Sequence, residues 1–411
     1  MFLNPIRTLN RATYQTARSL SRPRESYLLF RKDMTTVKLP WDMEVEILSW
    51  LPPRSLVGFR AVCKKWNSLL NDKSFLNQHS SRSRPQFIFL TKLKTYSIDV
   101  DLGGAGVGPT IKMCEVASDF PCQPMDWENI NVASCDGLLF REFLRKGVAV
   151  WNPWLKHMGL IEFKEKDFYF GGVGYDSKRP EKGYQILGYF CRVDDTCKKG
   201  YDEFAVYECA SKTFKFIDSP FRKWSLWSAI TEAAAPLSLE GNLFWIGYCD
   251  EIRESTIQSF SFSRGIFIKK FCMLPCEKVF YVNKLVLAIY KGDRLSLLNQ
   301  RYATGKIEIW VTKDKIDDRA QVVWVNLMNF STTNLPRLKD EYYGVRYFII
   351  DKTIIMCYEN SQTGAACIYI VSGDMFKKIP IDYGNVLECY YRVYFPNLIR
   401  LPLEFRRSLE I

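Results

Sequence analysis

Residues 39–66, LPWDMEVEILSWLPPRSLVGFRAVCKKW, carry helical periodicity at the front of a chain that otherwise has the pattern of β-strands. Asp42 and Glu44 suit the start of a first helix, because carboxylates cap and favour the positive end of the helix dipole. Pro52-Pro53 ends this helix, since a residue before proline is pushed out of the α region, and Pro53 can begin a second helix. A third helix follows, with apolar residues at i, i+4, i+7 and i+8.

Apolar side chains cover an unusually wide arc of the first helix. At 100° per residue they spread over roughly 220° of its circumference, whereas a surface helix needs a stripe of about 100°. They are Met43, Val45, Ile47, Leu48, Trp50 and Leu51. Three helices within about 35 residues cannot enclose a stable core of their own. The sequence therefore predicts a helical unit that packs on something larger and presents a second apolar face to a further partner.

The chain after Phe75 has the pattern of a large β domain. Strand-like runs separated by Gly, Asn and Asp turns recur about every 50 residues, the period of kelch-like propeller blades of four strands each. The runs are 96–101, 147–154, 204–217, 257–271, 306–314 and 366–379. The simplest architecture is a kelch-like, six-bladed or irregular β-propeller. A β-sandwich assembly with a coincidental period is the alternative.

Closure of such a ring makes a specific demand on the two ends of the β domain. A strand at Gln86–Leu90 should share a blade with the last segment, YYRVYFPNLIRL, because closure removes exposed strand edges. Truncation of either end should then unfold the whole domain. The predicted class is α+β and multidomain, with a three-helix domain at 35–80 and an all-β domain at 86–400.

Residues 1–34 form a basic tail rich in Arg, Ser and Thr. This composition is typical of an organelle transit peptide, but Met34 directly precedes the first structured segment. A disordered tail or an over-extended start site is therefore the favoured interpretation. We expect the protein in the nucleus, the cytoplasm or both, with an organelle as the alternative.

The net charge of +12 does not by itself indicate a nucleic-acid partner, because much of the excess lies in the tail and the rest is dispersed. No apolar run reaches the ~18 residues needed to cross a bilayer, so no membrane partner is expected. The 13 cysteines form no CxxC pair, and only His79 and His157 could complete a zinc site. We expect reduced thiols and no metal.

Motifs for catalysis or cofactor binding are lacking. The segment GGAGVG (103–108) has alternating glycines but no following helix to hold a pyrophosphate. No Walker-type lysine, GxSxG elbow or HExxH helix is present, and two histidines leave little material for acid–base chemistry. We therefore expect no enzyme activity and no cofactor.

Residues 38–75 closely resemble the F-box. The shared features are a Leu-Pro start, a first helix ending in Ile-Leu-x-x-Leu-Pro, a Ser-Leu-x-x-Phe/Arg second helix and a Val-Cys-Lys-x-Trp third helix. The resemblance implies docking on the Skp-type adaptor of a cullin-RING ubiquitin ligase. It also implies the residues that face the adaptor or hold the helices in register. These are Leu39, Pro40, Ile47, Leu48, Leu51, Pro52, Leu56, Val62, Cys63 and Trp66.

Residues 86–400 resemble the type 1 F-box-associated domain of plant F-box proteins. The resemblance rests on the order of WNPW, FGGVGYDS, FAVYECASKTFKFI, LEGNLFWIGY, IEIWVTKD and YFPNLIRL. Both resemblances together imply a non-catalytic substrate receptor of an SCF-type ligase that recruits an unknown protein target. A β-propeller binding module or enzyme with a helical cap and no ligase role is the alternative.

Trp224 and Trp227, in RKWSLWS, are the best aromatic candidates for a contact with the target. Packing between blades is the favoured role for these two tryptophans, and anchoring of the target is the alternative.

Overall fold

The structure is a computed structural model of the chain. It describes residues 39–91, 94–103, 108–116, 132–143, 147–155, 157–165, 167–179, 183–193, 200–219, 236–249, 252, 254–276, 284–316, 321–331, 335–338, 344–360, 365–382, 390–402 and 405. In this part of the chain, four short helices are followed by 24 strands. Trp224 and Trp227 lie outside the described residues, so their role stays a prediction.

The helices are α1 (Trp41–Ser49), α2 (Pro53–Phe59), α3 (Lys64–Leu69) and α4 (Lys73–Arg82). Pro53 opens α2, as its fixed φ and missing N–H predict. The sequence analysis expected three helices, and α4 is an addition. Its start is capped by Asp72, whose carboxylate accepts a hydrogen bond of 3.0 Å from the Phe75 amide. Asp72 three residues before Phe75 is the local signal that predicts this helix start.

The helical segment shares a buried core with two residues of the β domain. The helices contribute the buried side chains of Leu48, Leu56, Leu70 and Phe75, and the β domain contributes Leu155 and Leu398. A unit of this size gains most of its stability from such tertiary packing rather than from helix propensity. The expectation that the helices pack on something larger agrees with this cluster.

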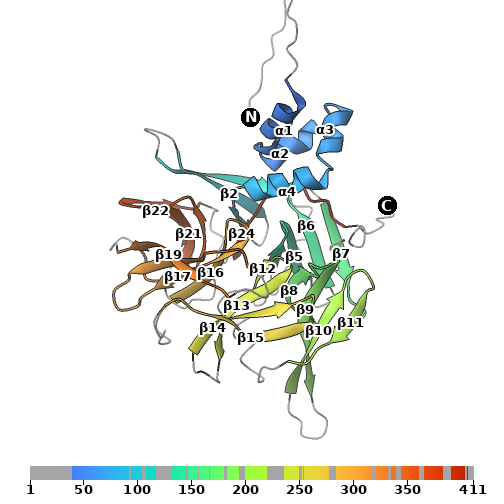
Figure 1. The fold of residues 1–411 in the computed structure, drawn as a ribbon, viewed down its shortest axis with the longest axis vertical. Helices are drawn as coiled ribbons and strands as arrows, with labels where there is room; N and C mark the ends of the chain where they lie inside the picture. The colour runs from blue at the N-terminus through green and yellow to red at the C-terminus, as the bar shows by residue number, and fades with distance from the viewer. Residues whose placement is uncertain are drawn as a thin grey trace, which may run out of the picture. The chain divides into compact units, whose positions relative to one another are not determined.

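The β domain consists of six four-stranded antiparallel sheets arranged as the blades of a propeller (Figure 1). Blade 1 contains β24 (Tyr390–Tyr394), β1 (Gln86–Leu90), β2 (Thr95–Asp101) and β3 (Thr110–Val116). Blade 2 contains β4 (Val132–Cys135), β5 (Leu138–Phe143), β6 (Gly147–Asn152) and β7 (His157–Glu162). Blade 3 contains β8 (Phe168–Tyr175), β9 (Tyr184–Val193), β10 (Gly200–Glu208) and β11 (Thr213–Phe216).

Blade 4 contains β12 (Leu237–Leu239), β13 (Asn242–Cys249), β14 (Glu254–Ser261) and β15 (Ile266–Met273). Blade 5 contains β16 (Lys284–Tyr290), β17 (Arg294–Gln300), β18 (Ile307–Thr312) and β19 (Trp324–Phe330). Blade 6 contains β20 (Arg346–Ile350), β21 (Thr353–Asn360), β22 (Ala365–Ser372) and β23 (Met375–Pro380). The predicted six-bladed propeller is thus confirmed, and the β-sandwich alternative is wrong.

Blade 1 closes the ring by joining strands from both ends of the β domain. β24 pairs antiparallel with β1 from Gln86↔Tyr394 to Leu90↔Tyr390. The sequence predicted this pairing, because an unpaired edge at either end would leave a row of backbone donors and acceptors without partners. The four-stranded sheet is therefore complete only when the last strand of the domain is in place.

Two buried asparagines fasten the segment after β24 to blade 2. Asn152, in the WNPW motif, donates from Nδ2 to Asn397 Oδ1 at 3.2 Å and to the Ile399 carbonyl at 2.8 Å. Asn397, in the FPNLI motif, donates to the carbonyl of Asp136. Because buried polar groups must be hydrogen-bonded, these two amides fix the path of the returning chain. We call this pair the asparagine clamp.

The inner hairpin of four blades repeats one turn. The residue after the inner strand has a left-handed backbone in blades 2, 4, 5 and 6, with φ between 49° and 53°. These residues are Asp136, Glu240, Lys291 and Asp351. In blades 2 and 4 the following glycine, Gly137 or Gly241, is left-handed as well, as a two-residue hairpin requires, and this explains the Asp-Gly and Glu-Gly pairs in the sequence.

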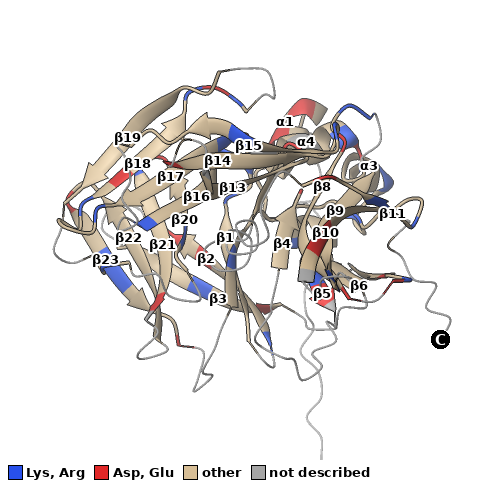
Figure 2. Ribbon diagram, turned by 90° about the horizontal axis from the view of Figure 1, so that it is seen from below, with Lys and Arg blue, Asp and Glu red and all other residues tan. Residues whose placement is uncertain are grey.

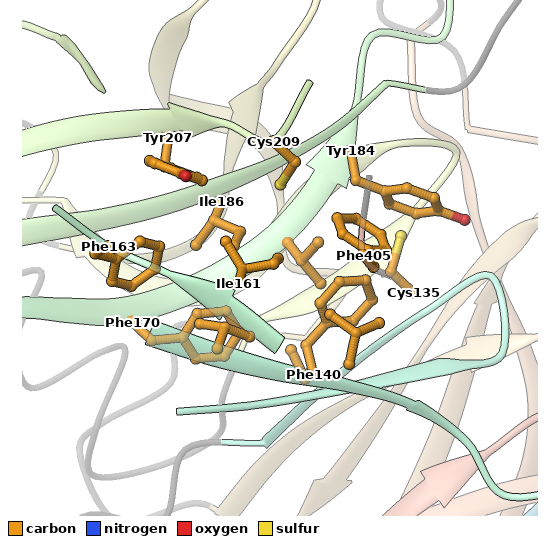
Figure 3. Close-up of a cluster of buried hydrophobic side chains, with 14 of the residues drawn as sticks. Cys135, Phe140, Ile161, Phe163, Phe170, Tyr184, Ile186, Tyr207, Cys209 and Phe405 are labelled. Carbon is orange, nitrogen blue, oxygen red and sulfur yellow. The ribbon is translucent and has the colours of Figure 1, made fainter. Parts of the chain in front are cut away.

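A buried apolar cluster fills the space between blades 2 and 3 (Figure 3). Phe140 of β5 lies 5.7 Å from Tyr184 of β9 between ring centroids, and Phe405 meets both rings at 6.1 Å and 5.7 Å. Phe405, which follows the closing segment, is thus part of the core between blades 2 and 3. Aromatic side chains of this size supply most of the apolar area that such interfaces bury.

The role of the asparagine clamp can be tested by comparing substitutions at Gly137, which contacts the clamp, and at Gly292, a glycine in the inner-hairpin turn of blade 5. A Cβ at Gly137 (φ +70°) would collide with the Asn397 side chain and the Phe395 carbonyl, whereas one at Gly292 (φ +83°) would meet nothing within 4 Å. Gly292→Ala should therefore cost about 1 kcal/mol of unfolding free energy through φ alone. Gly137→Ala should cost about 3 kcal/mol or more. Denaturant unfolding of both variants measures the difference, and equal losses would contradict the clamp.

Candidate functional site

α1 has a buried apolar face and an exposed one. Leu48 is 3% exposed and Val45 and Leu51 pack partly against the same core. On the other face Ile47 is 52% exposed and Trp50, in the turn after the helix, is 65% exposed. Val62, after α2, is 61% exposed. We call Ile47, Trp50 and Val62 the exposed apolar set, and large apolar side chains gathered in this way indicate an interaction surface.

The exposed indole of Trp50 is held in place rather than left free. Its Nε1 donates a hydrogen bond of 3.0 Å to Glu46 Oε1. Arg82 of α4 pairs with the same carboxylate at 3.0 Å, and its guanidinium carbon lies 4.6 Å from the Trp50 ring centroid. Hydrogen bonds from Arg82 and Trp50 lower the pKa of the Glu46 carboxyl. A fixed aromatic side chain loses less entropy on binding a partner.

The ten residues that the F-box resemblance implied fall into three groups. Leu39, Pro40, Ile47, Pro52, Val62 and Cys63 are exposed. Leu51 and Trp66 are half-buried, and Leu48 and Leu56 are buried. The exposed group is available to a partner, and the buried pair holds the helices together. Met43 at 56% exposure and Trp50 were missed, although both belong to the wide apolar arc of the first helix.

The Val-Cys-Lys-x-Trp motif has a local structural role. Cys63 is the N-cap of α3, and its sulfur accepts a hydrogen bond of 3.4 Å from the Trp66 amide. The Trp66 ring lies 5.3 Å from the Phe59 ring, which joins α3 to α2. Cys63 is itself exposed, so capping and partner contact are both open to it. The sequence motif thus fixes the geometry of the third helix.

His79 connects α4 to the end of α1. Its Nε2 lies 2.9 Å from the carbonyl of Leu51, two residues after the end of α1. Its Nδ1 is buried and has no hydrogen-bond partner among the described residues. Burial lowers the pKa of His79, and the hydrogen bond to the Leu51 carbonyl offsets only part of this effect. The ring is therefore neutral, with Nε2–H as the donor to Leu51.

The described residues form neither a metal site nor a membrane span. No three His, Cys, Asp or Glu side chains in this part of the chain come together to hold a metal ion. No helix among the described residues is long and apolar enough to cross a membrane. Lys and Arg positions are scattered over the blades rather than collected on one element (Figure 2). The exposed apolar set is therefore the strongest candidate for a site on the described surface.

Comparison with known families agrees with this architecture. Residues 37–78 match the F-box domain, and residues 86–401 match the F-box associated beta propeller domain. The chain therefore belongs to the family of F-box proteins that carry an F-box-associated β-propeller.

The relatives come from Arabidopsis thaliana. "F-box protein At3g17710" is 55% identical over 376 residues, which are 90% of this chain and 99% of that protein. "Protein SUPPRESSOR OF NIM1 1" is 44% identical over 89% of this chain and 99% of its own length. "Jacalin-related lectin 38" is 38% identical over 89% of this chain and 68% of its own length. The match covers nearly the whole length of the first two proteins and about two thirds of the third.

Protonation of His79 should make the helical segment sensitive to acid. Its pKa is lowered in the folded state from the ordinary 6.5, so below pH 6.5 the unfolded chain binds a proton that the folded chain does not. Stability should therefore fall as the pH drops through 6.5 toward the folded-state pKa. Each pKa unit of lowering corresponds to about 1.4 kcal/mol.

The measurement is the thermal midpoint at pH 7.5 and pH 5.5 for the wild type and for His79→Gln, whose amide can donate to Leu51 without titrating. The wild type should lose more stability on acidification than the variant does. An equal loss in the two proteins would show that His79 does not carry the effect.

Proposed function

We propose that this protein is the substrate-recognition subunit of an SCF-type ubiquitin ligase. The helical segment docks on a Skp-type adaptor and through it on a cullin-RING ligase. The propeller holds a target protein so that a lysine of the target lies near the ubiquitin-charged enzyme. The contribution of this chain is positional, because holding two reactants together replaces a bimolecular encounter. It supplies no catalytic group.

The observation that carries this proposal is the exposed apolar set beside a buried face on the same helix. The buried face is already covered by Leu56, Leu70 and Phe75, so the core of the segment does not need Ile47 or Trp50. Ile47 and Trp50 are three residues apart, and leaving two large apolar side chains this close together in contact with water is unfavourable unless a partner covers them. The match to the F-box domain over residues 37–78 supports a Skp-type adaptor as this partner.

The charge distribution of the segment is compatible with docking through apolar contacts. Glu46 and Arg82 flank Trp50 and neutralise each other at 3.0 Å, so they form a polar rim rather than a charged centre. An apolar centre with a polar rim is the usual anatomy of a specific protein interface. Trp50 is the expected anchor, since tryptophan is enriched among residues that dominate binding energy.

Neighbouring residues on α1 separate docking from folding. Ile47→Asp places a charge on the exposed face, so it should leave the fold intact and weaken adaptor binding by about 2 kcal/mol or more. Leu48→Asp places a charge in the buried core and should unfold the helical segment. Trp50→Ala should behave like Ile47→Asp.

The measurement is co-purification and titration calorimetry of the full chain with a Skp-type adaptor, with circular dichroism as the check on folding. Asp42→Ala, a change on an exposed residue of the same helix that removes no apolar contact, is the control and should bind normally. Failure of the wild type to bind any Skp-type adaptor would contradict the proposal and favour a propeller module without a ligase role.

A further inference from the structure

The centre of the propeller is lined by strands that carry basic residues and no acidic ones. The six inner strands, one per blade, are β24, β4, β8, β12, β16 and β20, and none contains Asp or Glu. They do contain Lys284, Arg346 and Arg392. Lys284 and Arg346 are the first residues of β16 and β20, and Arg392 is the third of the five residues of β24.

These three cations come from consecutive blades. β20 contacts both β16 and β24, so the starts of the three strands lie next to one another at one end of the channel. We call this end the basic mouth. The opposite end carries the inner-hairpin turns of blades 2, 4, 5 and 6, in which Asp136, Glu240, Asp293 and Asp351 outnumber Lys291 and Lys352. The charge along the channel is therefore polarised, with the positive end where the inner strands begin.

Arg346 and Arg392 are satisfied only in part by the protein. Arg346 donates from Nη1 to the Val345 carbonyl at 3.0 Å, and its buried Nε has no hydrogen-bond partner. Arg392 donates from Nε to the Val132 carbonyl at 3.2 Å, and its guanidinium carbon lies 4.8 Å from the Tyr390 ring centroid. Among the described residues neither guanidinium forms an ion pair with a carboxylate, and each has five N–H donors to satisfy.

The two guanidiniums also repel each other. Burial and the positive charge of Arg346 lower the pKa of Arg392 to about 10. Holding two half-buried like charges together without a counter-ion among the described residues is costly. Other arginines of the propeller have the opposite arrangement. Arg179 pairs with Glu208 at 3.0 Å, and Arg301 pairs with Glu308 at 3.1 Å.

Backbone contacts fix the position of this arginine pair. Tyr391, beside Arg392, donates a hydrogen bond of 2.6 Å to the Gly344 carbonyl, two residues before Arg346. This contact ties β24 to the start of β20. Arg392 in turn reaches the first residue of β4, so it spans the seam between blades 1 and 2. Donors that are fixed before binding lose little entropy when an anion arrives.

We propose that the basic mouth at Arg346 and Arg392 binds a phosphate monoester group. Two guanidiniums on the neighbouring strands β20 and β24 match a dianion in charge, and their planar N–H donors match phosphate oxygens in geometry. In a receptor that recruits a target protein, the group belongs to a phosphorylated side chain of that target, a step that rests on the function proposed above. Binding neutralises the repulsion between the two arginines, so the ligand stabilises the closed ring.

The test is titration calorimetry of the full chain with N-acetyl-phosphoserine amide, at constant ionic strength. N-acetyl-serine amide and inorganic phosphate are the comparison ligands. The wild type should bind the phosphoserine amide, and Arg346→Gln and Arg392→Gln should each weaken binding at least about tenfold. Arg179→Gln, which removes an arginine that already has carboxylate partners, is the matched control and should bind like the wild type.

A second measurement excludes a purely structural role for the arginines. Without ligand and at low salt, Arg346→Gln should melt no lower than the wild type, because the substitution removes a repulsion. If it unfolds, Arg346→Lys, which keeps the charge but not the planar donors, should fold and bind more weakly than the wild type.

Three outcomes would overturn the proposal. They are no binding by the wild type, equal binding by the wild type and both glutamine variants, and binding of N-acetyl-serine amide as tight as that of its phosphorylated form. Tighter binding of inorganic phosphate than of the phosphoserine amide would overturn the target segment as the source. Adaptor co-purification is measured separately, so loss of phosphate binding with retained adaptor binding counts against the basic mouth alone.

Discussion

The propeller depends on one pairing, that of β24 with β1. Five residues from the end of the domain complete the sheet that begins it, and every other blade is held between neighbours that this pairing keeps in place. The asparagine clamp and the Phe405 ring extend the same closure into blade 2 and blade 3. The ring is therefore a closed object whose inner surface exists only when both ends of the β domain have met.

The helical segment, unlike the propeller, is too small to bury all its apolar side chains. Its buried face joins Leu155 and Leu398 of the β domain, and the second of these lies one residue after Asn397 of the clamp. The segment's core is thus connected to the closing segment of the propeller. Its other face, with Ile47 and Trp50, remains for a partner. One helix therefore packs into the core on one side and exposes apolar side chains on the other.

Much of the fold could be predicted from sequence, because its signals are local or periodic. The blade period of about 50 residues, the Pro52-Pro53 break and the pairing of Gln86–Leu90 with the last segment all have direct physical causes in the chain. The division of the ten F-box positions could not be predicted. The helical period shows that the side chains of Ile47 and Leu48 point to different faces of the helix. It does not show which of these faces the neighbouring helices cover.

The basic mouth was invisible in sequence for a related reason. Arg346 and Arg392 lie on strands of different blades and become neighbours only through the closure of the ring. A search for clusters of charge along the chain finds nothing at these positions, since each cation stands alone among apolar residues. Asn152 and Asn397 were quoted in the WNPW and YFPNLIRL motifs, yet their hydrogen bonds needed the folded ring to be recognised.

The late position of β24 has a consequence for synthesis of the protein. The helical segment leaves the ribosome first, whereas blade 1 must wait for a strand made more than 290 residues after β1, from Leu90 to Tyr390. Until then β1 presents an open edge that a chaperone must shield from other chains. A chain that stops early would still display Ile47 and Trp50 but would lack a closed ring. Under the function proposed here, such a fragment would bind the adaptor without presenting a target.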